Sequence, residues 1–361
     1  MNSILANLKL LVGQDDARLT NFYADLSDTE VVSLVEAATQ ESNEDDLVTT
    51  VLHDLACFRA ASLTLAHGTL LSYSNDNYYD AGLWFQHASR ETTERLIGRT
   101  EKREERFRLA EIAWTGSELA EAQFREWQEN TPEFIKSRFS TMNALIHDAG
   151  WELNQAGERY NLFYKESRTL TWEPREDRFN SGTCRACKQH LDVLFDFDLT
   201  NPTLNFLALE GTRLRLPLCI NCLFDDPDSH ICFAVDTDGN YEWSNFNSEE
   251  SRPFYSDVAV DTSFWRENKL VPSQRTRPLL ESRRWCRYAN DHVGGHAGWM
   301  HDTDYPGCPS CNSSMKFIAQ CSDLNLTYAQ TTRYVGDEIE GILYAFLCPQ
   351  CMLSTYEYQT G

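Results

Sequence analysis

The chain has 361 residues, a formal net charge of −23 and twelve cysteines, and 42% of its residues are hydrophobic. This composition is typical of a globular protein of two or three domains and excludes an intrinsically disordered chain. No apolar run reaches the roughly 20 residues that a membrane helix needs, and the first residues predict a helix rather than a signal peptide. We therefore expect a cytoplasmic protein that does not bind membranes.

The acidic charge bears on the choice of partner. Affinity for nucleic acids comes largely from Lys and Arg side chains that release counterions from phosphates, so a nucleic acid is not the expected partner. The charge indicates one of two roles: it keeps the protein soluble, or it also attracts a basic protein partner over long distances.

Residues 1–165 predict an all-helical domain. The segment 27–30 has the Ser-x-x-Glu pattern of a capping box, and apolar residues follow at helical spacing over 31–35 and 47–65. A charged helix is expected over 89–114, and Pro132 in a first turn opens another. Short polar turns between helices indicate either a HEAT-like stack or an irregular bundle.

The pattern changes near Trp172 to the alternation of β-strands, so the fold class is α+β. A polar stretch with three prolines predicts a connector at 246–285, between a first β-rich unit at 166–245 and a second at 286–361. Strands are expected at 192–199, 214–218, 315–320, 342–347 and 353–358, and a hairpin at 230–243.

Eight of the cysteines form four Cys-x-x-Cys pairs, which repeat with a period of about 125 residues and similar flanking residues. This repeat indicates a duplicated zinc-ribbon unit. The first quartet is Cys184, Cys187, Cys219 and Cys222, and the second is Cys308, Cys311, Cys348 and Cys351.

Two such pairs present the four tetrahedral thiolates that Zn²⁺ favours, so we expect two structural Zn²⁺ ions, one in each quartet. Ligand pairing across the two copies, a redox dithiol and buried free thiols are the alternatives that the spacing leaves open. The remaining cysteines have no paired spacing and predict buried apolar positions: Cys57, Cys232, Cys286 and Cys321.

The segment 286–304 is rich in histidine and aspartate and contains His292, His296, His301, Asp302 and Asp304. One interpretation is a second kind of metal site or an acid/base cluster. The other is a glycine-rich turn that docks Trp299 beside the zinc ribbon.

A cluster of arginines precedes this segment and overlaps its start, at positions 275, 277, 283, 284 and 287. It could bind a phosphate or an acidic peptide, or it could pair with the protein's own carboxylates. No Walker loop, dinucleotide-binding glycine motif, His-Glu-x-x-His motif or nucleophile elbow is present, so no known catalytic signature supports an enzyme.

Four short motifs occur in order in the second unit: GGHAGW at 294–299, YP-x-CP-x-C at 305–311, M-x-F-x-x-Q at 315–320 and FLC-x-x-C at 346–351. This series resembles the zinc-ribbon and strand units of programmed cell death protein 2 and its relatives, and more distantly the bacterial YwqG-like proteins. The resemblance covers about 290–355 and is repeated loosely from 184. It departs at Ala297, where the resembled pattern has proline.

The resemblance implies a binding, chaperone-like or adaptor role without catalysis, and related bacterial domains look like immunity proteins. We therefore expect a non-enzymatic, zinc-stabilised protein that neutralises or chaperones a basic protein partner. The residues expected to contact this partner are Gly294, Gly295, His296, Trp299, Arg283 and Arg284. The alternatives are nucleic-acid binding through the cluster Arg275–Arg287 and a metal-dependent enzyme that uses His292, His296 and His301.

Overall fold

The computed structural model describes residues 16–40, 45–73, 81–103, 106–136, 142–176, 182–225, 230–247, 260–281, 291–322, 324, 327–328 and 341–359. The chain divides into two compact units. The first holds residues 1–160, and the second holds the chain from residue 161 onward except 284–286.

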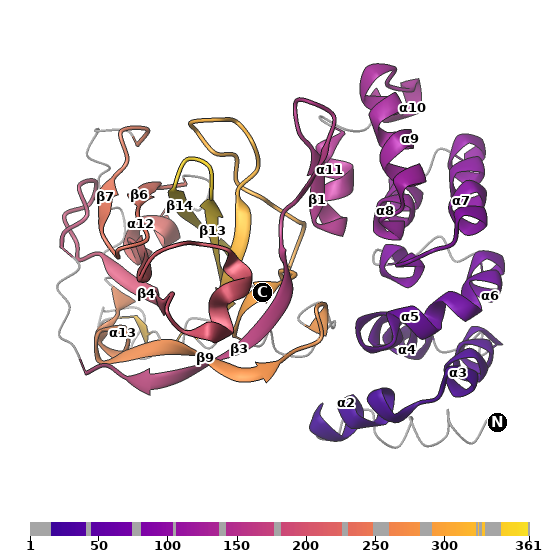
Figure 1. Cartoon of the computed structure of the whole chain (residues 1–361), viewed down its shortest axis with the longest axis horizontal. Helices are drawn as coiled ribbons and strands as arrows, with labels where there is room; N and C mark the ends of the chain where they lie inside the picture. Colours follow the sequence, from indigo (N-terminus) through magenta and orange to yellow (C-terminus); the bar gives the residue numbers. More distant parts are fainter. Residues whose placement is uncertain are drawn as a thin grey trace. The chain divides into compact units, whose positions relative to one another are not determined.

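The first unit is built of helices that follow one another in a stack (Figure 1). Its buried side chains are mostly aliphatic and come from one stripe of each helix, as in α3 with Val31, Leu34, Val35 and Ala38. The helices are α2 (Asp16–Asp25), α3 (Asp28–Gln40), α4 (Asp45–Phe58), α5 (Ala60–Leu63), α6 (His67–Ser72), α7 (Arg90–Arg103), α8 (Arg106–Thr115), α9 (Glu118–Glu129), α10 (Glu133–Lys136) and α11 (Asn143–Ile146), with 3₁₀ turns η1 (Thr64–Ala66), η2 (Ala81–Phe85) and η3 (His147–Ala149).

The predicted capping box at the start of α3 is confirmed. The amide of Ser27 donates to Glu30 Oε2 at 2.8 Å, and the amide of Glu30 donates to Ser27 Oγ at 3.3 Å. These bonds satisfy two backbone donors that the first turn leaves without helical partners. The hydrogen bond from Ser27 also lowers the pKa of the Glu30 carboxyl below its ordinary value. After α11, the short strands β1 (Trp151–Leu153) and β2 (Arg159–Asn161) pair with each other.

The second unit is mainly β, as predicted, and eight of its described strands form one sheet in the order β7-β6-β14-β13-β11-β10-β3-β9. The strand pairings in this sheet are antiparallel. Its members are β3 (Tyr164–Pro174), β6 (Phe233–Val235), β7 (Tyr241–Trp243), β9 (Asn268–Thr276), β10 (His292–Gly295), β11 (Lys316–Cys321), β13 (Ile342–Cys348) and β14 (Leu353–Gln359).

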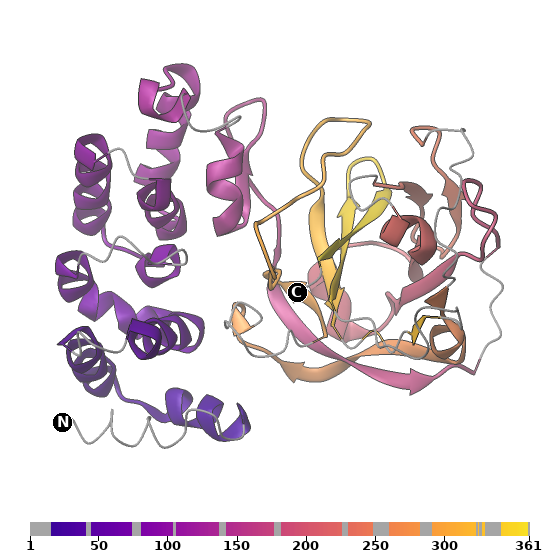
Figure 2. The ribbon, with the colours of Figure 1, turned by 180° about the vertical axis from the view of Figure 1, so that it is seen from behind.

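The strands β4 (Asp192–Asp198) and β5 (Arg213–Leu218) form a separate antiparallel pair, which connects the two ends of the large sheet. β4 contacts β9 at one end of the large sheet, and β5 contacts β6 and β7 at the other end. The strands therefore curve around a common interior, as Figures 1 and 2 show. Buried side chains from both sheets, including Phe195, Phe197 and Leu216 with Leu343 and Ala345, form one core.

Shorter elements complete the second unit. They are η4 (Pro202–Leu207), α12 (Ile220–Asp225), β8 (Val260–Asp261), α13 (Ser263–Glu267) and β12 (Thr327–Tyr328), and β8 pairs with β12. None of the helices in the described ranges combines the length and apolar character that a membrane crossing requires.

The connector predicted at 246–285 is wrong for the residues that the structure describes there. This range contains α13 and β9, and β9 pairs with β3 along most of its length. Pro272 lies within β9, the last strand in the order of the sheet. A proline is tolerated on an edge strand, because such a strand pairs with a neighbour on one side only and the missing N–H can lie on the other side. The two β-rich units predicted at 166–245 and 286–361 also share the large sheet, since β6 of the first pairs with β14 of the second.

Candidate metal centres

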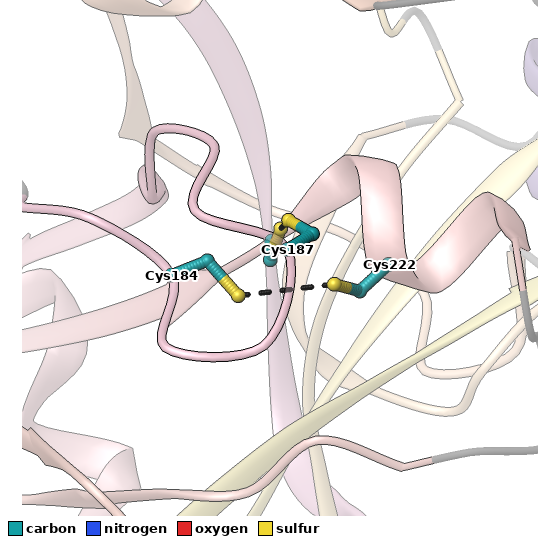
Figure 3. Close-up of side chains that lie close together, drawn as sticks. Cys184, Cys187 and Cys222 are labelled. Atoms are coloured by element: carbon teal, nitrogen blue, oxygen red, sulfur yellow. Dashed lines mark hydrogen bonds between the residues drawn. The ribbon is translucent and has the colours of Figure 1, made fainter. Parts of the chain in front are cut away.

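The four sulfurs of the first quartet converge from two parts of the chain. Cys184 and Cys187 lie in the loop before β4, Cys219 follows β5, and Cys222 lies in α12 (Figure 3). The Sγ–Sγ distances are 3.7 Å between Cys184 and Cys222 and 3.3 Å between Cys187 and Cys219. All four sulfurs lie within 4.8 Å of one another. Four thiolates on a tetrahedral zinc would lie roughly 3.8 Å apart, given Zn–S bonds of about 2.3 Å.

The second quartet has the same design on the large sheet. Cys308 and Cys311 lie in the loop before β11, Cys348 ends β13, and Cys351 lies in the turn before β14. The sulfurs of Cys311 and Cys348 are 3.7 Å apart, and the four sulfurs again lie within 4.8 Å of one another. Each quartet is formed within one copy of the cysteine repeat, so pairing across the copies does not occur.

The two loops that carry the first cysteine pair of each quartet have matching backbones. The amide of Lys188 donates to the carbonyl of Cys184 at 3.1 Å, and the amide of Asn312 donates to that of Cys308 at 2.8 Å. Lys188 and Asn312 have φ angles of 64° and 60°. This left-handed conformation turns the chain sharply enough to aim both sulfurs of a pair at one point.

Hydrogen bonds among the thiols set their pKa values. Hydrogen bonds from Cys187 and Cys219 lower the pKa of Cys184, and the reciprocal bond to Cys184 raises that of Cys219. Burial raises the pKa of Cys311, but hydrogen bonds from the backbone of Ser313 and from neighbouring thiols outweigh burial and bring it to about 7. Metal binding must displace the remaining protons, so the affinity of each quartet falls at low pH.

Both quartets can hold a metal ion with protein ligands alone. Five of the eight thiols are buried, and the other three, Cys187, Cys311 and Cys351, are partly exposed. Four protein ligands leave no coordination position for water or a substrate, which is the arrangement of a structural site and not of a catalytic one.

Three of the six residues expected to contact a partner are buried in the structure. Gly294, Gly295 and His296 are buried, and the two glycines belong to β10 between β11 and β3. The two glycines are core residues because β10 has a neighbouring strand on each side, and the buried ring of His296 packs 4.7 Å from that of Phe163. Trp299 is only half-buried, and its ring packs 4.7 Å from that of Tyr344. Trp299 thus packs against β13, whereas the glycines that were predicted to form a turn belong to strand β10.

The three histidines of the enzyme alternative do not meet. His292 is buried, and its Nε2 lies 3.2 Å from the carbonyl of His296, while His301 is exposed. The ring nitrogens of these histidines do not form a group of metal ligands within the described residues. The prediction of a metal site from His292, His296 and His301 is therefore wrong.

The arginine cluster is described only in part. Arg277 donates to Glu281 Oε2 at 2.8 Å, and only 5% of its side chain is exposed. The expectation that the cluster pairs with the protein's own carboxylates is confirmed at this position. Arg283, Arg284 and Arg287 lie outside the described residues. Of the unpaired cysteines, Cys57, Cys232 and Cys321 are buried as predicted, and Cys286 also lies outside the described residues.

One further group of ligand-type side chains converges in the described residues, and it was not predicted as a set from the sequence. A ring nitrogen of His230 and carboxylate oxygens of Asp304 and Glu357 lie within 4.8 Å of one another. Asp304 was among the candidates of the segment 286–304. The other two come from segments more than 50 residues away on either side, so no local spacing marks them.

Comparison with known proteins gives little functional information. No family model matches the chain, and no solved structure matches it. A curated protein of Salmonella typhimurium, named "Uncharacterized protein YpfL", is 28% identical over 264 residues, which is 70% of this chain and 58% of that protein. The chain thus spans less than two thirds of the length of this relative.

Proposed function

We propose that this protein is a non-catalytic binding protein, stabilised by two structural Zn²⁺ ions, that takes a basic protein as its partner. The observation that carries the proposal is the closure of both cysteine quartets. Eight of the twelve cysteines are directed at two points where the protein supplies every ligand. Residues in such sites contribute to folding rather than to chemistry.

Zinc is the metal that best fits four thiolates. Soft sulfur ligands in tetrahedral geometry select zinc or an iron–sulfur centre, and the sulfur separations of 3.3 and 3.7 Å suit a single ion. Each zinc would contribute on the order of 10 kcal/mol to folding, since a preformed site does not exist in the unfolded chain. The β-rich unit is thus expected to depend on both ions.

The repetition of a strand pair with a cysteine quartet at its end supports the structural role. In each copy, a cysteine loop leads into a strand, a second strand ends at the other cysteine pair, and these two strands pair with each other. They are β4 with β5 and β11 with β13. The isolated bridges Thr183↔His190 and Gly307↔Ser314 occupy the same place in the two loops. Such repetition of the loop, the strand pair and the four cysteines together is expected if each metal ion stabilises the strand pair that carries it.

A basic protein partner follows from the charge. With a formal net charge of −23, the protein attracts basic proteins over long distances and repels phosphate backbones. Neutralising a basic toxin and chaperoning a basic client are the two roles that this charge suits, both in the reducing cytoplasm, where thiols stay available for zinc. The buried ion pair of Arg277 removes one of the arginines on which nucleic-acid binding would depend.

The test is a pull-down with the zinc-loaded full chain from native host lysate, read by mass spectrometry at low and high salt. The proposal expects one basic protein at stoichiometric level, whose binding is then measured with the purified pair by calorimetry. Chain treated with chelator is the control and should bind nothing. Retention of nucleic acid that washes off with salt, or of no partner, would contradict the proposal.

A further inference from the structure

One face of β14 carries three buried polar residues in a row. Thr355, Glu357 and Gln359 alternate along the strand and so point to the same side of the sheet. Their exposed fractions are 0%, 9% and 8%. Buried polar side chains in a strand require partners, and a buried carboxylate in particular requires charge compensation.

The two outer residues of this row hold two different loops. Thr355 Oγ1 donates to the carbonyl of Ile231 at 3.0 Å and so fixes the segment that begins with His230. Gln359 Oε1 accepts from the amides of Met300 and His301, each at 3.1 Å. Its Nε2 donates to the carbonyl of Asp302 at 3.1 Å, which fixes the loop that leads to Asp304.

Glu357 lies between these two anchors, and the loops bring His230 and Asp304 to it. The ligand atoms of the three side chains lie within 4.8 Å of one another. His230 Nδ1 is 3.7 Å from Glu357 Oε2, which is too long for a hydrogen bond. Two ligands of a tetrahedral zinc would lie roughly 3.4 Å apart, given metal–nitrogen and metal–oxygen bonds of about 2.1 Å.

Two details of this group point to a cation. His230 Nδ1 is buried and has no hydrogen-bond partner within the described part of the chain. The carboxylates of Asp304 and Glu357 approach each other in a partly covered place, where like charges repel unless a positive charge lies between them. A divalent cation satisfies the nitrogen and both carboxylates at once.

We propose that His230, Asp304 and Glu357 form a third metal site that binds a divalent transition cation, with Zn²⁺ as the fitting ion. Imidazole with carboxylates suits zinc, and three protein ligands leave a coordination position for water or for an anionic ligand. Because it has no thiolates and Asp304 is exposed, this site exchanges its ion readily, unlike the two cysteine quartets. It is the one place among the described residues where an outside molecule can reach a bound metal.

The experiment uses the full chain already loaded with two zinc ions. Titration with Co²⁺ in equilibrium dialysis should show one further equivalent, whose visible absorption is weak and lacks the sulfur-to-cobalt charge-transfer band. Glu357→Gln and His230→Gln should each weaken this equivalent at least about 100-fold, more than the loss of an outer-shell partner of a metal ligand. The matched controls Asp302→Asn and His301→Gln alter the same loop outside the group and should bind Co²⁺ as the wild type does.

Retention of two zinc ions and an unchanged circular dichroism spectrum show that each variant is folded. If substitution of the buried Glu357 disturbs folding, Asp304→Asn replaces it in the experiment and should also weaken binding of the third ion, since the Asp304 side chain is exposed and its loss should leave the fold intact. The proposal is overturned if the wild type takes no third equivalent. It is equally overturned if folded variants at His230, Asp304 or Glu357 bind the third ion with unchanged affinity.

Discussion

The guanidinium of Arg213 binds the buried carboxylate of Asp196 through two hydrogen bonds of 2.6 Å each. Arg175 and Arg215 approach the same carboxylate at 3.2 and 3.4 Å, and the Asp196 side chain has no exposed surface. Arg175 also donates to the carbonyls of Trp265 and Asn268. One carboxylate thus links β4, β5 and the chain around α13 and β9.

Replacement of Asp196 by Asn is expected to reduce the free energy of unfolding by about 3 to 5 kcal/mol, because it leaves buried arginines without their counter-charge. Burial raises the pKa of Asp196, but the hydrogen bond and charge of Arg213 with the charges of Arg215 and Arg175 outweigh it and hold the pKa below its usual 3.8. This contribution is therefore present above pH 3.8 and is lost as the pH falls below that value.

Urea denaturation at pH 7.5 with zinc in excess measures the effect. The control is Asp238→Asn, an exposed position, which should change the free energy of unfolding by less than about 0.5 kcal/mol. Equal stabilities of the two variants would show that the ion-pair network does not stabilise the fold.

The pKa of Asp192, at the start of β4, is shifted in the opposite direction to that of Asp196. Burial raises its pKa to about 6, and the hydrogen bond from Thr262 and the charge of Arg266 offset only part of that effect. The folded state holds a proton between about pH 3.8 and 6 that the unfolded state has lost, so stability falls as the pH rises through this window. Above pH 6 the ionised carboxylate costs about 3 kcal/mol.

Asp192→Asn should therefore be more stable than the wild type at pH 7.5, by about 1 to 3 kcal/mol. The advantage should shrink as the pH is lowered from 7 to 5, where Asp192 takes up its proton. Guanidinium denaturation of both proteins over pH 5 to 7.5 measures the difference. A difference that does not change with pH would contradict the assignment.

Gly294 is expected to tolerate no side chain. Its φ angle is 70°, and a Cβ there would lie 2.3 Å from the carbonyl oxygen of Glu166 and 2.4 Å from the ring of Phe206. Gly294→Ala should cost about 3 to 5 kcal/mol through backbone strain and overpacking together. At Gly307 a Cβ would meet nothing within 4 Å, so Gly307→Ala is the matched control. Thermal melts that agree within error would contradict the packing of β10.

Local features of the fold were predictable because they depend on neighbours in the chain. Alternating residues predicted β4, β5, β11, β13 and β14, and the hairpin of β6 and β7 is confirmed with Gly239 at a φ of 85°. The cysteine spacing predicted both quartets. At β4 the alternation indicated a half-buried strand, whereas Asp192 and Asp196 are buried, because arginines from other segments cover the polar face.

The features that the sequence analysis missed depend on long-range pairing. Pro272 indicated a connector, since the edge position that tolerates a proline is known only from the order of the sheet. Gly294 and Gly295 indicated an exposed turn, although they lie within β10 at a shift in register with β3. The alternation of a strand does not specify its partner, so the shared sheet of the two cysteine units could not be predicted.

Removal of metal should unfold the β-rich unit. A strong chelator at pH 7.5 is expected to abolish its cooperative thermal transition, because each structural ion contributes on the order of 10 kcal/mol. Added zinc should restore the transition. Cys57→Ala, in α4 of the helical unit, removes a buried thiol outside both quartets and should respond as the wild type does. A β-rich unit that melts at the same temperature with and without chelator would contradict the structural role.

The most direct test of the account is the metal content of the purified full chain after exhaustive dialysis, measured by native mass spectrometry. Two tightly bound zinc ions are expected in the wild type and at most one in a Cys308→Ser, Cys311→Ser double variant, since the second quartet loses two of its ligands. A folded wild-type chain that carries no metal, or a double variant that still carries two ions, would contradict the central claim.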